Sequence, residues 1–269
     1  MLSADYRGVV VSETFAGIDV GTTMTKAAII DTDGMLLGRA VGRSGADLVL
    51  AASTAYEDAL ADARVARETV QFIVATGFGR RNVPFAHDTR TEISCHARGC
   101  YHYFPEALTV VDIGGQDSKI IKLDAGGRRV GFQMNRKCAA GTGSFLEDIA
   151  HKLDLPLADL NDMAAATTKA AQIGSYCTVF SATEVLERIR AGEETADIAR
   201  GLFDSVAKRI LEMDTLTGRV VMTGGVVAHN PIVAELLSAR AGVEVEIAPH
   251  PQVMGAFGAA LIAKAMASG

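Results

Sequence analysis

Proline and cysteine are scarce in this sequence of 269 residues, which has six prolines and four cysteines. Low-complexity tracts are missing, and the hydrophobic fraction of 49% suffices for one large domain or two small ones. Charged residues make up 22% of the chain, which argues against global disorder.

Long apolar segments are also missing. Asp5 and Arg7 precede the short apolar run near the N-terminus and Glu13 follows it, so a signal-peptide core is absent. The most apolar late segment, 254–263, is too short to span a bilayer. We therefore expect a soluble, cytoplasmic protein without a membrane partner, whose cysteines are thiols or metal ligands rather than disulfides.

Positive charge does not dominate either. The net charge is −6 and the isoelectric point is about 5.5, which argues against a broad nucleic-acid binder but allows a local anion site. The P-loop pattern G-x-x-x-x-G-K-[ST] does not occur, and the glycine motifs at 77–82 and 141–146 lack the third glycine of the dinucleotide fingerprint. A phosphate ligand would need a different device.

An internal repeat supplies such a device. The segment AGIDVGTTMTKAAIID at 16–31 resembles VVDIGGQDSKIIKLD at 110–124, with one offset of 93 residues throughout. The matched pairs are Asp19 with Asp112, Gly21 with Gly114, Thr25 with Ser118, Lys26 with Lys119, and Asp31 with Asp124. Two copies at this distance indicate two related half-domains rather than a solenoid.

Each copy is typical of two strands around a tight turn. The expected strands are 16–20 and 27–30 in the first copy, and 110–113 and 120–123 in the second. Glycine allows a turn backbone to approach a ligand, and successive turn amides can bind an anion. Ordinary hairpins with Asp-Gly turns are the alternative, which the second copy in register disfavours.

Several side chains of the repeat suit a nucleotide. Lys26 could reach a phosphate or be an exposed strand lysine. Asp19 and Asp112, at the ends of their strands, could face one another, hold Mg²⁺ through water, or orient an attacking water. A third glycine site, Gly224-Gly225, follows a β-prone run and precedes a helix expected from Pro231, which fits a turn over the far end of a ligand.

Six sequence blocks together resemble a known family: GIDVGTTMTK, SCHARG, DIGGQDSK, MNRKCAAGTGSFLE, YCTVFSATEV and PQVMGAFGAAL. Within the ATPase superfamily of actin, hexokinase and the heat-shock chaperones, they are similar to the ATP-dependent activators of 2-hydroxyacyl-CoA dehydratases. The same family, of BadF/BadG/BcrA/BcrD type, includes the nucleotide-binding subunits of benzoyl-CoA reductases. The resemblance covers about 15–263.

The resemblance implies an α/β fold of two actin-like (ribonuclease H-like) domains with a nucleotide cleft between them. We expect residues 1–98 plus 250–269 in the first domain and 99–249 in the second. The resemblance also implies ATP or ADP and Mg²⁺ as cofactors, with Asp19, Asp112 and Gln116 as catalytic residues. The phosphate and adenosine contacts would come from Gly21, Thr22, Thr23, Lys26, Gly114, Gly115, Gln116, Asp117, Gly224 and Gly225.

Two cysteines lie at expected helix starts, Cys138 before AAGTGSFLEDIAHKL and Cys177 before TVFSATEVLERI. A helix N-terminus favours a thiolate or a negatively charged cluster, although the spacing alone favours two buried cysteines at helix caps over metal ligands. The resemblance implies that each chain gives these two thiolates to one [4Fe-4S] cluster. Because such a cluster needs four, a homodimer or a dimer with a related subunit would complete it.

Cys95 and Cys100 belong to SCHARGCYHY, which also offers His96 and His102. This segment could mimic a zinc site, but if it is helical, Cys95 and His96 point to different faces. The family block includes Cys95, yet its cysteine is not among the cluster ligands.

The implied function is ATP-driven transfer of single low-potential electrons to a partner enzyme. That partner would be an acyl-CoA dehydratase or the catalytic subunits of a benzoyl-CoA reductase, with reduced ferredoxin or flavodoxin as the donor. One alternative is a sugar- or acetate-type kinase of the same fold without a cluster. Another is a nucleotide-dependent scaffold resembling actin relatives.

Overall fold

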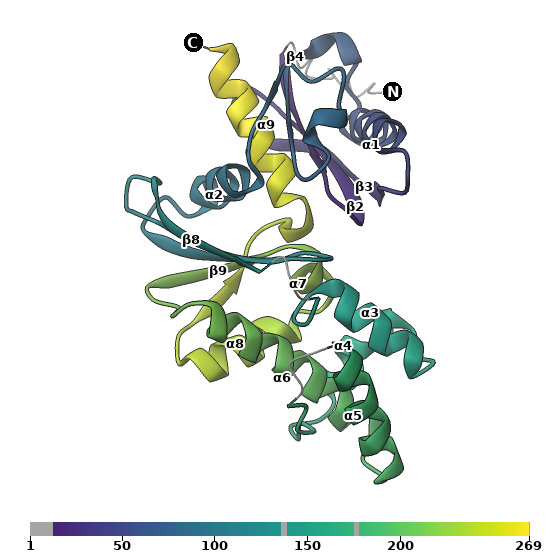
Figure 1. Cartoon of the computed structure of the whole chain (residues 1–269). Coiled ribbons are helices and arrows are strands. Elements are labelled where there is room, and N and C mark those ends of the chain that lie inside the picture. The colour runs from purple at the N-terminus through teal and green to yellow at the C-terminus, as the bar shows by residue number, and fades with distance from the viewer. Residues whose placement is uncertain (1–12, 136–138, 175–177, 269) are drawn as a thin grey trace, which may run out of the picture.

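Two five-stranded sheets form the centre of the molecule, and the computed structural model describes residues 13–135, 139–174 and 178–268 (Figure 1). The strand order is β3-β2-β1-β4-β5 in the first sheet and β10-β9-β6-β7-β8 in the second. The strands are β1 Thr14–Val20, β2 Met24–Ile30, β3 Leu36–Arg43, β4 Val70–Thr76, β5 Asp88–Thr89, β6 Leu108–Ile113, β7 Ser118–Leu123, β8 Arg129–Asn135, β9 Arg219–Thr223 and β10 Val245–Ile247.

The two sheets have the same topology, so the repeat in the sequence is a repeat of structure. In each sheet three strands form an antiparallel meander, and two further strands run parallel to the first. Asp19 pairs with Lys26 across β1 and β2, and Asp112 pairs with Lys119 across β6 and β7. The predicted hairpins are confirmed, with the same register in both copies.

Helices cover the faces of both sheets. The α-helices are α1 Leu48–Ala63, α2 Glu92–Tyr103, α3 Gly143–Lys152, α4 Leu160–Ala165, α5 Thr178–Arg190, α6 Thr195–Met213, α7 Gly225–His229, α8 Ile232–Ala241 and α9 Met254–Ala267. Short 3₁₀ turns occur at η1 Arg67–Thr69, η2 Arg80–Asn82, η3 Leu157–Asp159 and η4 Pro251–Val253.

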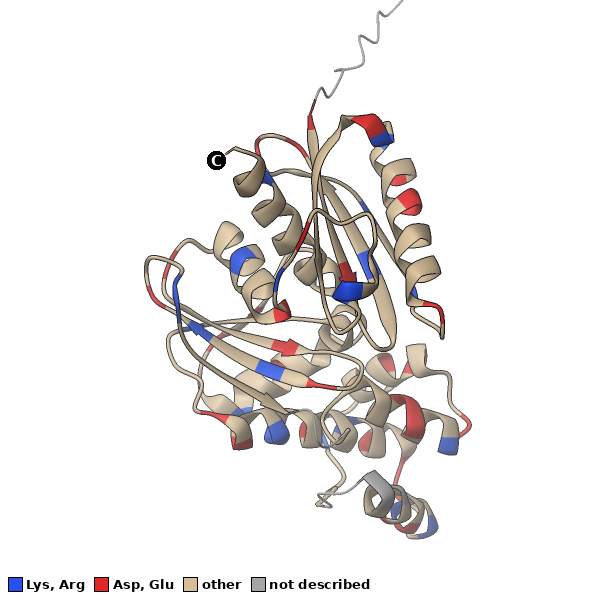
Figure 2. Cartoon of the chain, turned by 45° about the horizontal axis from the view of Figure 1, so that its top comes forward, with Lys and Arg blue, Asp and Glu red and all other residues tan. Residues whose placement is uncertain are grey.

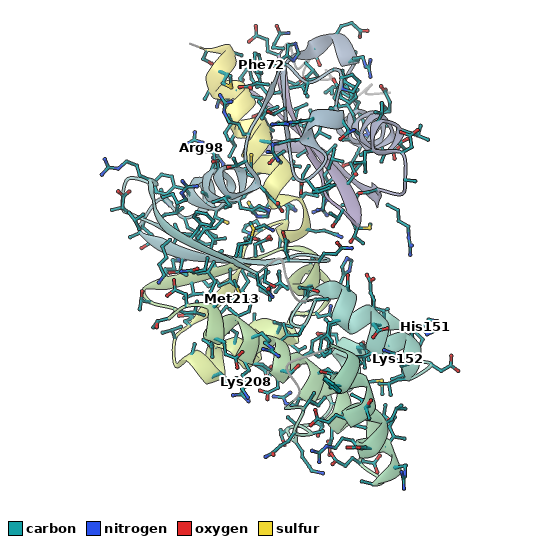
Figure 3. All side chains as sticks on the ribbon, in the orientation of Figure 1. Phe72, Arg98, His151, Lys152, Lys208 and Met213 are labelled. Carbon is teal, nitrogen blue, oxygen red and sulfur yellow. The ribbon has the colours of Figure 1, made fainter. Side chains whose placement is uncertain are left out.

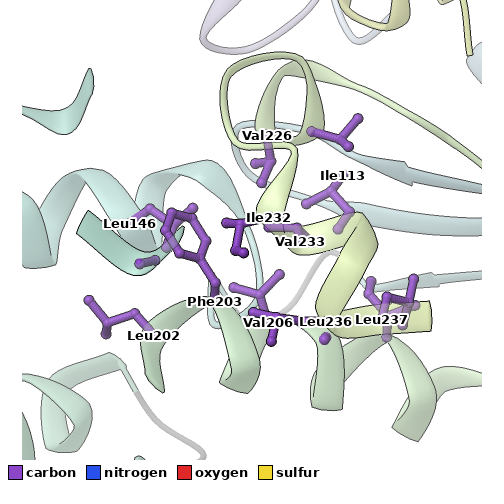
Figure 4. Close-up of a cluster of buried hydrophobic side chains, with 14 of the residues drawn as sticks. Ile113, Leu146, Leu202, Phe203, Val206, Val226, Ile232, Val233, Leu236 and Leu237 are labelled. Carbon is purple, nitrogen blue, oxygen red and sulfur yellow. The ribbon is translucent and has the colours of Figure 1, made fainter. Parts of the chain in front are cut away.

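Three apolar cores hold these layers together. One lies between the first sheet and α1, and a second joins α2 and α9 to strands of both sheets. Every residue of β1 is buried because helices cover both faces of this central strand. The third core packs α3, α6 and α8 on the outer face of the second sheet (Figure 4). Each fully buried aliphatic or aromatic side chain there stabilises the fold by about 1.5–3 kcal/mol.

The C-terminal helix α9 packs closely on β1 and crosses α2 (Figure 1). A β-carbon added at Gly17 would lie 1.9 Å from the carbonyl oxygen of Ala256, and one added at Gly258 would lie 1.8 Å from that of Cys95. Only glycine fits at these two points, so the chain end is fixed against the first sheet and against the helix that connects the sheets.

Lysine and arginine are interspersed with aspartate and glutamate over both halves of the chain (Figure 2). Within the described ranges, no helix combines the length and the apolar character needed to cross a membrane.

Candidate functional site: a cleft between two repeated hairpins

The turn between β1 and β2 lies against the turn between β6 and β7. A β-carbon added at Gly115 would lie only 2.7 Å from Thr23 Oγ1, so the two turns touch across the junction of the sheets. The second turn is closed by a hydrogen bond of 2.9 Å, which the amide of Gly114 donates to the carbonyl of Asp117. The repeated hairpins therefore form the two walls of one cleft.

Three adjoining cavities run through this cleft. The middle cavity, of about 90 Å³, is lined by both turns and by charged side chains. An apolar cavity of about 380 Å³ opens beside α3 and α7, and its walls include Leu146, Leu157 and Val226. A far cavity of about 510 Å³ lies beyond the opposite end, between Phe78 and Phe132. The cleft can therefore take an elongated ligand with a polar centre and an apolar end.

Two lysine ammonium groups, of a partly exposed Lys26 and a fully buried Lys119, lie at the floor of the middle cavity. Lys26 Nζ lies 3.1 Å from Asp19 Oδ2. Lys119, with a side chain that is 0% exposed, contacts three carboxylates: Asp112 at 3.0 Å, Asp117 at 2.7 Å and Glu92 at 2.9 Å. The lysine of the second hairpin thus pairs with more carboxylates than the lysine of the first.

This network shifts the proton affinities of its members. Burial alone would lower the pKa of Lys119, but Asp112 and the other carboxylates outweigh it and raise the value. Burial opposes ionisation of Asp112, yet His96 and Lys119 together hold the pKa of Asp112 below its usual range. For Glu92 burial dominates, so its pKa is raised even though Lys119 acts in the opposite direction.

The two repeated aspartates have different surroundings. Asp112 Oδ1 accepts a hydrogen bond of 2.9 Å from the Thr223 hydroxyl and lies 3.5 Å from His96 Nδ1. Asp19 Oδ1 is buried and has no hydrogen-bond partner among the described residues. Burying a carboxylate oxygen without a hydrogen-bond partner costs free energy. Asp19 Oδ1 is therefore the atom of the cleft wall that most needs a ligand.

All the residues predicted from the glycine motifs line the middle cavity. They are Asp19, Gly21, Thr22, Thr23, Lys26, Asp112, Gly114, Gly115, Gln116, Asp117, Gly224 and Gly225. Gly224 has φ +101°, and a β-carbon there would lie 2.3 Å from the carbonyl oxygen of Ile113, so this turn requires glycine. The helix expected from Pro231 is α8, but a short helix, α7, precedes it and starts at Gly225.

Sequence reasoning missed Glu92 and Phe78, which both line the middle and far cavities. Glu92 is the first residue of α2, after the helix cap Thr91, and that cap signal could have predicted a helix start at Glu92 but not its position in the cleft. Phe78 lies between two glycines and is 73% exposed. His96 also lines the cleft, whereas the exposed Arg98 projects from the outer side of α2 (Figure 3).

The cysteines divide into two pairs. Cys138 and Cys177, the predicted cluster ligands, lie outside the described residues. Cys95 and Cys100 are buried free thiols in α2, and burial raises the pKa of Cys95 to about 12. Among the described residues, the one cluster of side chains that could hold a metal ion includes neither Cys95 nor Cys100. The structure therefore gives no support to the zinc alternative.

Comparison with known proteins places this cleft in a family. The model of the BadF/BadG/BcrA/BcrD ATPase family matches residues 16–263. The (R)-2-hydroxyglutaryl-CoA dehydratase activating ATPase of Acidaminococcus fermentans is 39% identical over 251 residues, which are 92% of this chain and 95% of the relative.

Solved structures agree with that placement. The crystal structure of component A of the same Acidaminococcus fermentans dehydratase has a TM-score of 0.90 at 37% identity and covers 96% of this chain and 100% of its own. The activator of the 2-hydroxyisocaproyl-CoA dehydratase from Clostridium difficile, with bound ADPNP, has a TM-score of 0.88 at 35% identity and covers 95% and 96%. The chain therefore belongs to the BadF/BadG/BcrA/BcrD ATPase family and has its two-domain, actin-like fold.

Proposed function

We propose that this protein uses ATP hydrolysis to drive low-potential single electrons from a [4Fe-4S] cluster into a partner acyl-CoA enzyme. The partner is a 2-hydroxyacyl-CoA dehydratase or a benzoyl-CoA reductase, and the electron donor is reduced ferredoxin or flavodoxin. Similarity over nearly the whole chain to activators of such dehydratases supports the choice of partner. One of the benzoyl-CoA reductase subunits of Thauera aromatica is a more distant relative, at 27% identity.

The observation that carries the proposal is a direct link between the phosphate turn and α3. The amides of Gly143 and Ser144 donate hydrogen bonds of 2.9 and 2.8 Å to the carbonyls of Gly114 and Gly115. The Ser144 hydroxyl donates a second bond, of 2.6 Å, to Gly115. A change in the phosphate turn is therefore passed to the start of α3, five residues after Cys138.

The nucleotide is proposed to lie along the three cavities. Its base and ribose occupy the apolar cavity beside Gly224 and Gly225, and its phosphates lie between the two turns. Gly21, Thr22, Thr23 and Lys26 bind phosphate from one side, and Gly114, Gly115, Gln116 and Asp117 bind it from the other. The domains proposed around this cleft are 1–98 with 250–269, and 99–249, so that the boundary at 98 falls within α2.

The donor set of the middle cavity fits a divalent cation. Asp19, Glu92, Asp112 and Asp117 face two ammonium groups, which leaves an excess of two negative charges where polyphosphate must bind. A hard cation with oxygen ligands compensates that excess, and the unpaired Asp19 Oδ1 is an oxygen available to its hydration shell. We assign Asp19 and Asp112 to hold Mg²⁺ through water, and Gln116 to orient the attacking water.

Two features of the described residues support a shared cluster. Helix α5 begins at Thr178, directly after Cys177, and α3 and α5 contact one another, so the two cysteine segments lead into adjoining helices. Helix α5 also exposes Phe180 and Leu186, at 67% and 53%, which suits an interface with a second chain. Two thiolates from each chain of a dimer would complete the four that a [4Fe-4S] cluster requires.

Anaerobic production followed by iron and sulfide analysis tests the proposal. We expect about four irons and four sulfides per dimer, the complement of one [4Fe-4S] cluster, a visible absorption shoulder, and loss of both in Cys177→Ser. A colourless protein that phosphorylates a small molecule would instead favour the kinase, for which the far cavity offers space. Iron content that is unchanged in Cys177→Ser would refute the ligand assignment.

A further inference from the structure

A fourth cavity, of about 390 Å³, lies where the chain returns from the second sheet to α9. Three basic side chains line it: Arg39 from β3, His229 at the end of α7, and His250 just before η4. None of the described residues in its wall is acidic. The rest of the wall is formed by Val41, Ala228, Pro251, Gln252 and Val253. A cavity with this lining favours a ligand that carries negative charge.

The contact between Arg39 and His250 leaves a positive charge in this cavity. Arg39 Nη1 lies 2.7 Å from His250 Nδ1. Because a guanidinium can only donate, Nδ1 must accept, and the imidazole is neutral in this arrangement. Burial and, after it, the charge of Arg39 lower the pKa of His250. The partner of Arg39 here is thus a neutral ring, which does not balance the charge of the guanidinium.

The backbone of His250 is strained. It has φ 51° and ψ 49°, in the left-handed region, which residues with a side chain rarely adopt. Pro251 follows it, and a proline further disfavours helical backbone angles in the residue before it. Strained residues of this kind are found at ligand clamps and switch regions. The Gly224 amide donates a hydrogen bond of 2.9 Å to the Pro251 carbonyl, so the strained segment is tied to the glycine turn of the middle cavity.

The basic side chains come from both halves of the molecule. Arg39 belongs to the first sheet, whereas His229 ends α7, which contacts strands β6 and β9 of the second sheet. His229 and Gln252 also line the apolar cavity, where the base and ribose are proposed to lie. A ligand held between Arg39 and His229 would therefore bridge the two sheets beside the nucleotide.

We propose that the fourth cavity binds a phosphate-type dianion, which holds the cleft closed and thereby tightens nucleotide binding. Arg39 and His229 bind the dianion from opposite halves through charge-assisted hydrogen bonds. The dianion is either inorganic phosphate, which ATP hydrolysis releases, or a phosphate monoester such as the 3′-phosphate of coenzyme A. By thermodynamic linkage, bound nucleotide must tighten binding of the dianion by the same factor.

The affinity of the anaerobically produced protein for ADPNP tests this coupling. ADPNP keeps the terminal phosphate position of the cleft occupied, so added phosphate cannot act there. At constant ionic strength and free Mg²⁺, we expect inorganic phosphate to lower the Kd of ADPNP by about fivefold or more. In Arg39→Gln and in His229→Gln, the Kd values measured with and without phosphate should agree within about twofold.

Arg43→Gln is the matched control. Arg43 is exposed on the same strand and the substitution changes the net charge equally, but Arg43 does not line the cavity. Four residues of a strand span about 13 Å, which exceeds the screening length of about 8 Å at physiological ionic strength. This variant should keep the full effect of phosphate on the Kd of ADPNP.

Calorimetric titrations of ADPNP-saturated protein distinguish the two sources of the dianion. Inorganic phosphate, coenzyme A and 3′-dephospho-coenzyme A are compared in the parent and in Arg39→Gln. Coenzyme A that binds about tenfold more tightly than phosphate, with loss of this advantage in the dephospho form, identifies the monoester. Equal affinity for coenzyme A and inorganic phosphate, or binding of phosphate alone, identifies the free ion. In each case the Arg39→Gln variant should lose the binding.

The proposal is wrong if phosphate leaves the Kd of ADPNP unchanged in the parent, or lowers it equally in the parent and in Arg39→Gln. Equal loss of the effect in Arg43→Gln and Arg39→Gln would also overturn it, because the effect would then reflect net charge. The inference requires only that a nucleotide binds in the cleft, so its failure leaves the iron–sulfur proposal standing. Conversely, a protein without iron can still show the predicted coupling.

Discussion

The Ser144 hydroxyl donates a hydrogen bond of 2.6 Å to the carbonyl oxygen of Gly115. This contact joins the first turn of α3 to the turn between β6 and β7, in addition to the backbone bond between the same residues. It therefore offers a way to weaken the link between the cleft and the cysteine segment without changing the residues that line the cleft.

Ser144→Ala should separate hydrolysis from its proposed effect on the cluster. We expect ATPase activity within about threefold of the parent, because a single neutral hydrogen bond contributes about 1 kcal/mol. The ATP-induced change in the visible spectrum of the anaerobic protein should shrink. Ser205→Ala is the control, since Ser205 makes a similar bond to a backbone carbonyl inside α6. Identical spectral responses in both variants would contradict the link.

Gly258→Ala should destabilise the crossing of α2 and α9. The new methyl group would lie 1.8 Å from the Cys95 carbonyl oxygen, and the helices must separate to accommodate it. Overpacking of this kind costs about 1–3 kcal/mol or more, visible as a lower Tm in circular dichroism. Gly42→Ala adds a methyl group to open space and should leave the Tm nearly unchanged. Equal Tm values for the two variants would show that the crossing is looser than described.

Lys119→Met should be the more damaging of two lysine substitutions. It leaves Asp112, Asp117 and Glu92 without their shared ammonium partner, and removing one member of a buried ionic cluster costs about 3–5 kcal/mol. Lys26→Met removes the partner of Asp19 alone, and its side chain is 18% exposed, so the loss should be smaller. Urea unfolding at neutral pH compares them, and the reverse order would contradict the ranking.

Asp112 should make stability depend on pH in the acidic range. Its pKa in the folded protein is lowered, so its contribution is fully present above the unfolded value of about 3.9 and is lost as the pH falls through the folded value. Urea unfolding between pH 6 and 3 should show a decline that is shallower in Asp112→Asn. A decline of equal slope in both proteins would assign the effect to other carboxylates.

Cys95 and Cys100 should resist alkylation in the folded protein. Burial raises the pKa of Cys95 to about 12 and raises that of Cys100 as well, so little thiolate forms at pH 8. Mass spectrometry after brief iodoacetamide treatment should find both unmodified, whereas treatment in urea should label both. Rapid labelling of the native protein would show that α2 opens.

The sequence repeat was sufficient to predict the paired hairpins and their alignment, because strand register follows from the matched Asp and Lys positions. The glycine motifs and the family resemblance together indicated most of the residues that line the middle cavity, since close backbone approach requires glycine at fixed places. Glu92 could not be predicted in the same way. It reaches the cleft only because α2 crosses between the sheets, and no local pattern states where a helix will lie in the folded molecule.

The Gly258 contact fixes the first turns of α2 against α9. The carbonyl of Cys95 occupies the space that a side chain at Gly258 would fill. Because of this close contact, α9 and α2 cannot slide along one another without a steric clash. In any opening of the cleft, the first turns of α2 would therefore move together with α9. A small rotation of the second sheet against this fixed pair would become a larger displacement at the outlying end of α5, which lies far from both helices (Figure 1).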